Sequence, residues 1–292
     1  MGMYVNIGNA GFQSVRKGRY IDKSGLITFI NETLGTKDKL TCVSRPRRFG
    51  KSFATQMLCA YYDKSCDSRE LFCDLEIAKE PSFETNLNKF DVIYLDITWF
   101  ISTVKNVKNT VSYLQEQVIR GLFKSSLTDK MIEAAYMTGI LPIKKYGTQS
   151  ALTDFREYTM IQPKKLARYV GFTEEEVKSL CDENGLDFEE AKNWYDGYTF
   201  SREQSVYSPN SVMQAIQNEE FGDYWTETET YESLKNYIGR NEDGLRDAII
   251  TMLGGARCKI NTRESELKIL LEMEEMHMCF TLEEIKEKFI PI

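Results

Sequence analysis

Short continuous apolar runs alternate with segments of helical spacing along the first half of the chain. The run at residues 90–97 is apolar on both faces, as are parallel strands that helices cover on both sides. We predict strands at residues 39–44, 90–97, 132–141 and 156–161. The segments at residues 53–62 and 104–123 carry apolar side chains at helical spacing and are predicted to be helices.

Strands that alternate with helices of this length predict a parallel sheet with right-handed crossovers, and hence an α/β fold. Later in the chain the pattern changes to short helices with explicit caps. Thr173 and Glu176 form a capping-box pattern, Gly185 is a predicted helix end, and Pro209 stands near the first turn of a further helix. We therefore predict an α/β core at 1–161, a helical lid or subdomain at 162–255 and a charged helical tail at 256–292.

The segment Arg45-Pro-Arg-Arg-Phe-Gly-Lys-Ser52 stands between the first predicted strand and the first predicted helix. A loop that ends in Gly-Lys-Ser lets backbone N–H groups, a helix N-terminus and one ammonium converge on a polyphosphate. Gly50 would allow close backbone approach, Lys51 would reach the β- and γ-phosphates, and Ser52 would offer its hydroxyl to Mg²⁺. We predict that the loop binds a nucleoside triphosphate through Arg45, Arg47, Arg48, Phe49, Gly50, Lys51, Ser52 and Phe53.

The first half of this loop departs from the general phosphate-loop pattern. That pattern has glycine at the position of Arg45, and Pro46 follows with a fixed φ angle. A solvated basic turn that caps the next helix is the alternative interpretation. The strand-loop-helix order favours phosphate binding, because the four positive charges from Arg45 to Lys51 would repel one another unless a polyanion occupied the loop.

Four further segments accompany the loop: Tyr20-Ile-Asp-Lys-Ser-Gly-Leu-Ile27, Ala135-Tyr-Met-Thr-Gly-Ile-Leu-Pro-Ile-Lys144, Gly171-Phe-Thr-Glu-Glu-Glu-Val177 and Trp194-Tyr-Asp-Gly-Tyr198. Together they resemble the bacterial and archaeal AAA-ATPase-like proteins, whose phosphate loop reads Arg-Pro-Arg-Arg-Phe-Gly-Lys-Ser. The resemblance covers about residues 4–260 and implies a P-loop NTPase core that binds ATP and Mg²⁺. Longer members often carry a C-terminal restriction-endonuclease-like domain, which the remaining residues are too few to build, so we expect no nuclease activity.

Hydrolysis needs an acidic residue at a strand end to hold Mg²⁺ and a neighbour that orients the attacking water. Family members place an Asp-Glu pair between the counterparts of Leu122 and Ile132, and this chain has no such pair there. We interpret the gap as the loss of one strand-helix unit of the core, which would move Asp96 nearer to the phosphate loop. Asp96 would then hold Mg²⁺ through water, together with Ser52. The alternative for Asp96 is a turn or helix-cap role.

Thr138 ends a predicted strand at a position where AAA-type proteins keep a polar residue that senses the γ-phosphate. Hydrogen bonding to the local backbone is the alternative for this strand-end threonine. Lys51, Thr138 and Asp96 are the predicted catalytic residues, and Ser52 and Asp96 are the predicted metal ligands.

The loop arginines and the earlier Asp-Lys pair each have two interpretations. Arg45, Arg47 and Arg48 would stabilise a transferring phosphate, in cis or from a neighbouring subunit, or would pair with acidic residues of the lid. Asp22 and Lys23 match the family's Asp-Lys. They would either line the nucleotide pocket or form an ion pair that ties the N-terminal arm to the core.

Composition narrows the class of protein. The 292 residues are 42% hydrophobic and 28% charged, and the net charge of −7 argues against a surface built wholly for nucleic acid. The seven cysteines include no Cys-x-x-Cys pair, and the sequence has a single histidine that could complete a metal site. We therefore expect no structural zinc site. The sequence opens with no secretory leader and has no run of about 20 apolar residues, which predicts a cytoplasmic protein without a membrane span.

Three functions remain, in order of preference. The first is an AAA-like ATP-binding protein with retained or weak ATPase activity, acting alone or as a homo-oligomer. The second is a nucleotide-dependent interaction module, or pseudoATPase, that binds ATP to fix the lid and acts on a protein or nucleic-acid client. The third is a nucleic-acid-binding protein that uses the basic loop without a nucleotide. The missing Asp-Glu pair favours the second over a competent motor.

Overall fold

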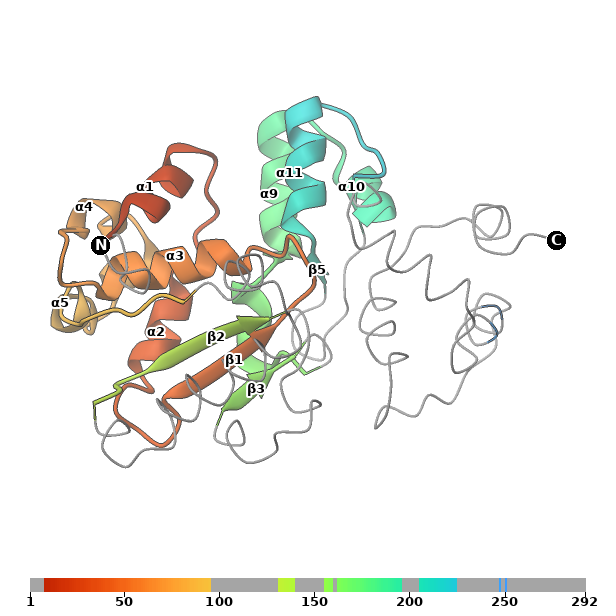
Figure 1. Ribbon diagram of the computed structural model, residues 1–292. Coiled ribbons are helices and arrows are strands. Elements are labelled where there is room, and N and C mark those ends of the chain that lie inside the picture. The colour runs from red at the N-terminus through yellow and green to blue at the C-terminus, as the bar shows by residue number, and fades with distance from the viewer. Residues whose placement is uncertain are drawn as a thin grey trace, which may run out of the picture. The chain divides into compact units, whose positions relative to one another are not determined.

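A computed structural model describes residues 8–95, 131–139, 155–159, 162–195 and 205–224, together with positions 247 and 250. The chain divides into two compact units, and Figure 1 labels the helices and strands. The first unit comprises residues 1–45 and 50–159, and the second comprises residues 46–49 and 160–292.

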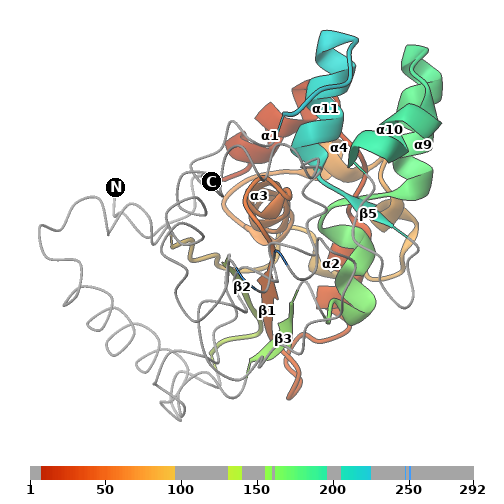
Figure 2. The same ribbon diagram turned by 90° about the vertical axis from the view of Figure 1, so that its right-hand side faces the viewer.

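The first unit contains a parallel sheet of three described strands. Strand β1 (Leu40–Ser44) is central, with β2 (Ala135–Gly139) on one side and β3 (Arg156–Tyr158) on the other, as Figure 2 shows. All five residues of β1 are buried, which explains why this strand reads as a continuous apolar run. The predicted α/β architecture with parallel strands is confirmed for these three segments.

The described part of the first unit also contains helices. They are α1 (Ala10–Lys17), α2 (Gly25–Asn31), α3 (Lys51–Tyr62), α4 (Arg69–Phe72), the 3-10 helix η1 (Glu76–Lys79) and α5 (Phe83–Asn86). Helix α3 starts two residues before its predicted start and buries the predicted Met57, Leu58 and Tyr61. Helix α1 packs along α3, and Phe29 of α2 meets the ring of Tyr158 edge to face. The sheet and α3 are thus fixed by packing on both sides of the loop that joins them.

The predicted strand at residues 90–97 is wrong over its described part. Residues 90–95 form no continuous strand: Phe90 and Ile93 are single β-bridge residues, and the side chain of Ile93 is 65% exposed. Phe90 instead makes an isolated parallel bridge with Asp63, and its carbonyl accepts the N–H of Lys64, just after α3. An apolar run does not reveal what it will pack against, and here it pairs with the end of a helix. Residues 96 and 97 lie outside the described residues.

The second unit contains mainly short helices. Its elements are η4 (Lys164–Tyr169), β4 (Phe172–Thr173), α9 (Glu174–Asn184), α10 (Phe188–Tyr195), β5 (Val206–Tyr207) and α11 (Pro209–Asn218). Thr173 and Glu176 form the predicted capping box at the start of α9, and Gly185 ends that helix in the left-handed conformation. Pro209 is the first residue of α11, as predicted. The prediction missed the antiparallel pairing of β4 with β5, because each strand is only two residues long.

Gly171, just before β4, stands where a side chain has no room. Its φ angle is +116°, and a Cβ atom built there would lie 2.4 Å from Cγ1 of Val206. The same atom would lie 3.4 Å from the ring of Phe49, whose side chain is buried. Glycine at this position therefore lets the Phe49 ring and β5 approach the backbone closely.

Gly185 offers a matched control for Gly171, because its φ angle is also positive and nothing lies within 4 Å of a Cβ built there. We expect Gly185→Ala to destabilise by about 1 kcal/mol through backbone strain alone. Gly171→Ala should cost at least about 2 kcal/mol more, because it adds a clash in a packed core. Urea unfolding followed by circular dichroism measures both. Equal losses would contradict the packing described for Phe49 and Val206.

Candidate functional site

The loop after β1 presents backbone donors at the start of α3. Gly50 is the N-cap of this helix in the left-handed conformation, with φ of 80°. The first helical hydrogen bond runs from the N–H of Ala54 to the carbonyl of Gly50, so the N–H groups of Lys51, Ser52 and Phe53 precede the helical ladder. Such groups, with the helix dipole, favour an anion. The helix is twelve residues long, which is enough for its dipole to develop.

Arg45 lies at the junction of β1 and the loop, and hydrogen bonds connect it to all three strands. Its backbone N–H donates to the carbonyl of Gly139 in β2 at 3.1 Å. Its Nη1 atom donates to the carbonyl of Ser44 in β1 at 2.8 Å and to that of Tyr158 in β3 at 3.1 Å. The side chain is fully buried, and burial lowers the pKa of the guanidinium to about 10. The Nε and Nη2 atoms are buried without a hydrogen-bond partner in the described part of the chain.

Lys51 is held at the same junction. Its Nζ atom donates to the backbone carbonyl of Arg45 at 2.9 Å, which brings the ammonium from the first turn of α3 back to the first residue of the loop. A lysine in this position can leave a carbonyl and move to a phosphate oxygen, because both are oxygen acceptors and the phosphate carries charge.

Thr138 lies at the same edge of the sheet as Arg45. It is the register partner of Val43, and Gly139 is the partner of Ser44, so both strands end at this edge. The first unit therefore gathers three of the predicted residues, Arg45, Lys51 and Thr138, at the carboxyl ends of its strands. Ligands of open parallel sheets bind at that edge.

The remaining predicted residues are distributed differently. Ser52 and Phe53 are exposed on the first turn of α3, and the Phe53 side chain is 57% exposed. Arg47 and Arg48 are exposed and belong with Phe49 to the segment that groups with the second unit. The ring of Phe49 is part of a core, so any nucleotide contact from this residue would come from its backbone. Asp96 lies outside the described residues.

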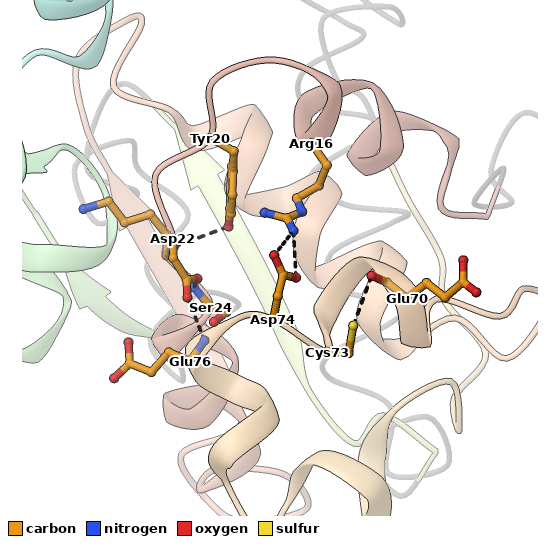
Figure 3. A network of polar contacts seen from close by, with 9 residues as sticks. Arg16, Tyr20, Asp22, Ser24, Glu70, Cys73, Asp74 and Glu76 are labelled. Carbon is orange, nitrogen blue, oxygen red and sulfur yellow. Dashed lines mark hydrogen bonds and ion pairs between the residues drawn. The ribbon is translucent and has the colours of Figure 1, made fainter. Parts of the chain in front are cut away.

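The Tyr20–Ser24 segment forms a polar network that sequence reasoning missed (Figure 3). The two carboxylate oxygens of Asp22 accept the N–H groups of Ser24 at 2.8 Å and Glu76 at 2.7 Å. The hydroxyl of Ser24 accepts the N–H of Ile77 at 3.1 Å. These bonds fix the start of η1 and leave the Asp22 carboxylate bonded to backbone groups. The signal in the sequence was the Asp-x-Ser spacing, which is typical of a side chain that bonds the backbone two residues later.

Tyr20 connects this network to α3. Its hydroxyl accepts the N–H of Lys23 at 3.3 Å and donates to the sulfur of Met57 at 3.2 Å. Burial raises the pKa of this hydroxyl well above its ordinary value, so it stays protonated and able to donate. Arg16 and Asp74 close the network on its exposed side with an ion pair of 2.7 Å.

Asp22→Ala should lower the free energy of unfolding by about 1–2 kcal/mol, because two backbone donors lose a charged acceptor. Asp74→Ala is the matched control, since its exposed pair with Arg16 should contribute under about 1 kcal/mol. Chemical denaturation measures both variants. If Asp22→Ala were as stable as the parent protein but failed to bind nucleotide, the pocket role of Asp22 would be correct and the capping role wrong.

No helix among the described residues is long and apolar enough to cross a membrane. The same part of the chain also contains no group of three or more histidine, cysteine, aspartate or glutamate side chains placed to hold a metal ion.

Comparison with known proteins finds a family similar to the part of the chain that carries the loop. Residues 6–121 match the AAA-ATPase-like family, which is described as "Predicted AAA-ATPase". That segment includes β1, the loop and α3, and the match supports an ATPase-like kind of protein.

The chain is also similar to an "Uncharacterized protein in vnfD 5'region" from Azotobacter chroococcum mcd 1. The two are 29% identical over 105 residues, which is 35% of this chain and 20% of that protein. The chain thus matches about a fifth of the length of this relative. No solved structure matches the chain.

Proposed function

We propose that the chain binds ATP with Mg²⁺ through the loop at residues 45–52 and hydrolyses it weakly. The observation that carries the proposal is the hydrogen bond from Lys51 Nζ to the Arg45 carbonyl, at the head of α3 and at the carboxyl edge of a parallel sheet. The match of residues 6–121 to an ATPase-like family supports the same ligand class. A general anion site on a helix N-terminus would need no lysine folded back onto the strand end.

In the proposed complex, phosphate oxygens accept the N–H groups at the start of α3, and Lys51 moves from the Arg45 carbonyl to the β- and γ-phosphates. The exposed hydroxyl of Ser52 binds Mg²⁺, which neutralises part of the phosphate charge. Thr138, near the carboxyl end of β2, is the residue that we propose contacts the γ-phosphate. Each of these groups lies on an element that packing holds in place.

The sequence is the basis for proposing weak turnover. Phosphoryl transfer requires an acidic residue for the metal and a group that orients water, and the chain has no Asp-Glu pair between residues 122 and 132. Asp96 is the proposed replacement for the metal-holding acid. A pseudoATPase that binds ATP without turnover is the second candidate, and the same missing pair favours it.

Lys51→Ala should abolish stabilisation by MgATP. A ligand at about 100 times its dissociation constant raises the free energy of unfolding by about 2.7 kcal/mol, and a thermal-shift assay detects a change of that size. Lys79→Ala, which removes an exposed lysine from η1, should keep the full shift. If the parent protein showed no shift, or if Lys51→Ala shifted as much as the parent, the loop would not be the nucleotide site.

Phosphate release separates the two candidates. We expect the parent protein to release phosphate from MgATP faster than Lys51→Ala but slowly, because the water-orienting acid is missing. A rate equal to that of Lys51→Ala, together with an intact thermal shift, would identify a pseudoATPase.

A further inference from the structure

Arg45 occupies the position that general phosphate loops give to glycine, yet its side chain points into the interior and not toward solvent. Three of its hydrogen bonds are to carbonyls at the ends of three different strands, those of Gly139, Ser44 and Tyr158. A fourth is accepted by its own carbonyl from Lys51. One residue therefore links the whole edge of the sheet to the lysine expected to bind phosphate.

We propose that Arg45 is a positioning residue, which acts on phosphate through Lys51. This inference rests on the proposed function and adds how the loop is prepared for its ligand. The backbone N–H and the guanidinium of Arg45 are anchored on opposite sides, to β2 and to β3. Because the N–H and the guanidinium are both anchored, the backbone carbonyl of Arg45 has a fixed direction. The Lys51 ammonium donates to that carbonyl, so its position is fixed as well.

Stability alone does not explain the buried guanidinium. A buried charge is costly unless a partner offsets it, and an apolar residue of similar volume is often as stable or more so. Among the described residues the Arg45 side chain bonds carbonyls and pairs with no carboxylate. The free-energy cost of burying this charge is explained if the side chain orients the loop. Fixing the direction of one peptide group needs an anchored side chain, which glycine lacks.

The hydrogen bonds of Arg45 also predict which substitutions at this position preserve the loop. Nη1 alone donates to both Ser44 and Tyr158, while Nε and Nη2 make no hydrogen bond among the described residues. A lysine ammonium carries three donors and can make the same two bonds, so Arg45→Lys should restore the loop. Methionine matches the stem of arginine without the donors. Glycine restores the general phosphate-loop pattern but removes the anchor.

The test compares binding of MgATP to the parent protein, Arg45→Lys, Arg45→Met and Arg45→Gly by isothermal titration calorimetry. We expect Arg45→Lys to bind within about threefold of the parent, and the other two at least about tenfold more weakly, because two hydrogen bonds that hold the loop are lost. The general pattern predicts the opposite order for glycine. Binding by Arg45→Gly that equals the parent would overturn the proposal.

A second readout follows Lys51 directly and needs no nucleotide. An amine-reactive reagent should modify Lys51 slowly in the parent and in Arg45→Lys, and several-fold faster in Arg45→Met and Arg45→Gly, relative to the exposed Lys79 in the same molecule. A purely structural role would leave that ratio unchanged in every variant that keeps the circular dichroism spectrum of the parent. An unchanged ratio in Arg45→Gly would therefore also overturn the proposal.

The two readouts keep this inference separate from the proposed function. If the parent protein fails to bind MgATP but the Lys51 reactivity follows the expected order, the proposed function is wrong and the positioning role of Arg45 stands. If MgATP binds the parent and all three variants alike, the proposed function stands and the role of Arg45 is wrong. If Arg45→Met does not fold, Arg45→Gly and Arg45→Lys decide the question.

Discussion

The loop between β1 and α3 depends on the hydrogen bonds that converge on Arg45. A loop of this kind must hold several N–H groups in one direction against the entropy of a flexible segment, which amounts to about 1–2 kcal/mol for each ordered residue. Here the strand side of the loop is fixed by bonds to the carbonyls of Gly139, Ser44 and Tyr158. Because those three carbonyls belong to three strands, the direction of the loop is set by the sheet itself.

The helix side of the loop is fixed independently. Met57 of α3 accepts a hydrogen bond from Tyr20, and Tyr61 donates to the carbonyl of Phe83 at 3.0 Å, so the helix is held along its length. The Asp22 network in turn holds the segment that carries Tyr20 against η1. Lys51 sits between these two supports, which is why a side chain with a long flexible stem has one defined resting place.

The sequence allowed the regular elements to be predicted where a local signal existed. Strand β1 lies in a short run of apolar and β-branched residues. The capping box of Thr173 and Glu176 and the helix end at Gly185 are each signals carried by at most a few neighbouring residues. The apolar run at residues 90–95 failed because the burial of a run depends on distant partners that composition does not reveal.

The site was predictable in part. Gly50, Lys51 and Ser52 were proposed as site residues from their spacing, because phosphate chemistry constrains it. The burial of Arg45 could not be found, because its acceptor on Tyr158 is 113 positions away in the sequence. An arginine beside other arginines reads as a basic surface, and only the fold distinguishes the side chain that turns inward. The Asp22 network was missed for a similar reason, since the Asp22 carboxylate accepts the N–H of Glu76, which is 54 positions away in the sequence.

The most direct test is a crystal structure of the protein with Mg²⁺ and a non-hydrolysable ATP analogue. We expect the triphosphate at the N-terminus of α3, with Lys51 Nζ moved from the Arg45 carbonyl to the β- and γ-phosphates. The Arg45 guanidinium should remain on the carbonyls of Ser44 and Tyr158. A nucleotide bound elsewhere, or an Arg45 side chain that leaves the interior to contact phosphate itself, would contradict this description of the loop.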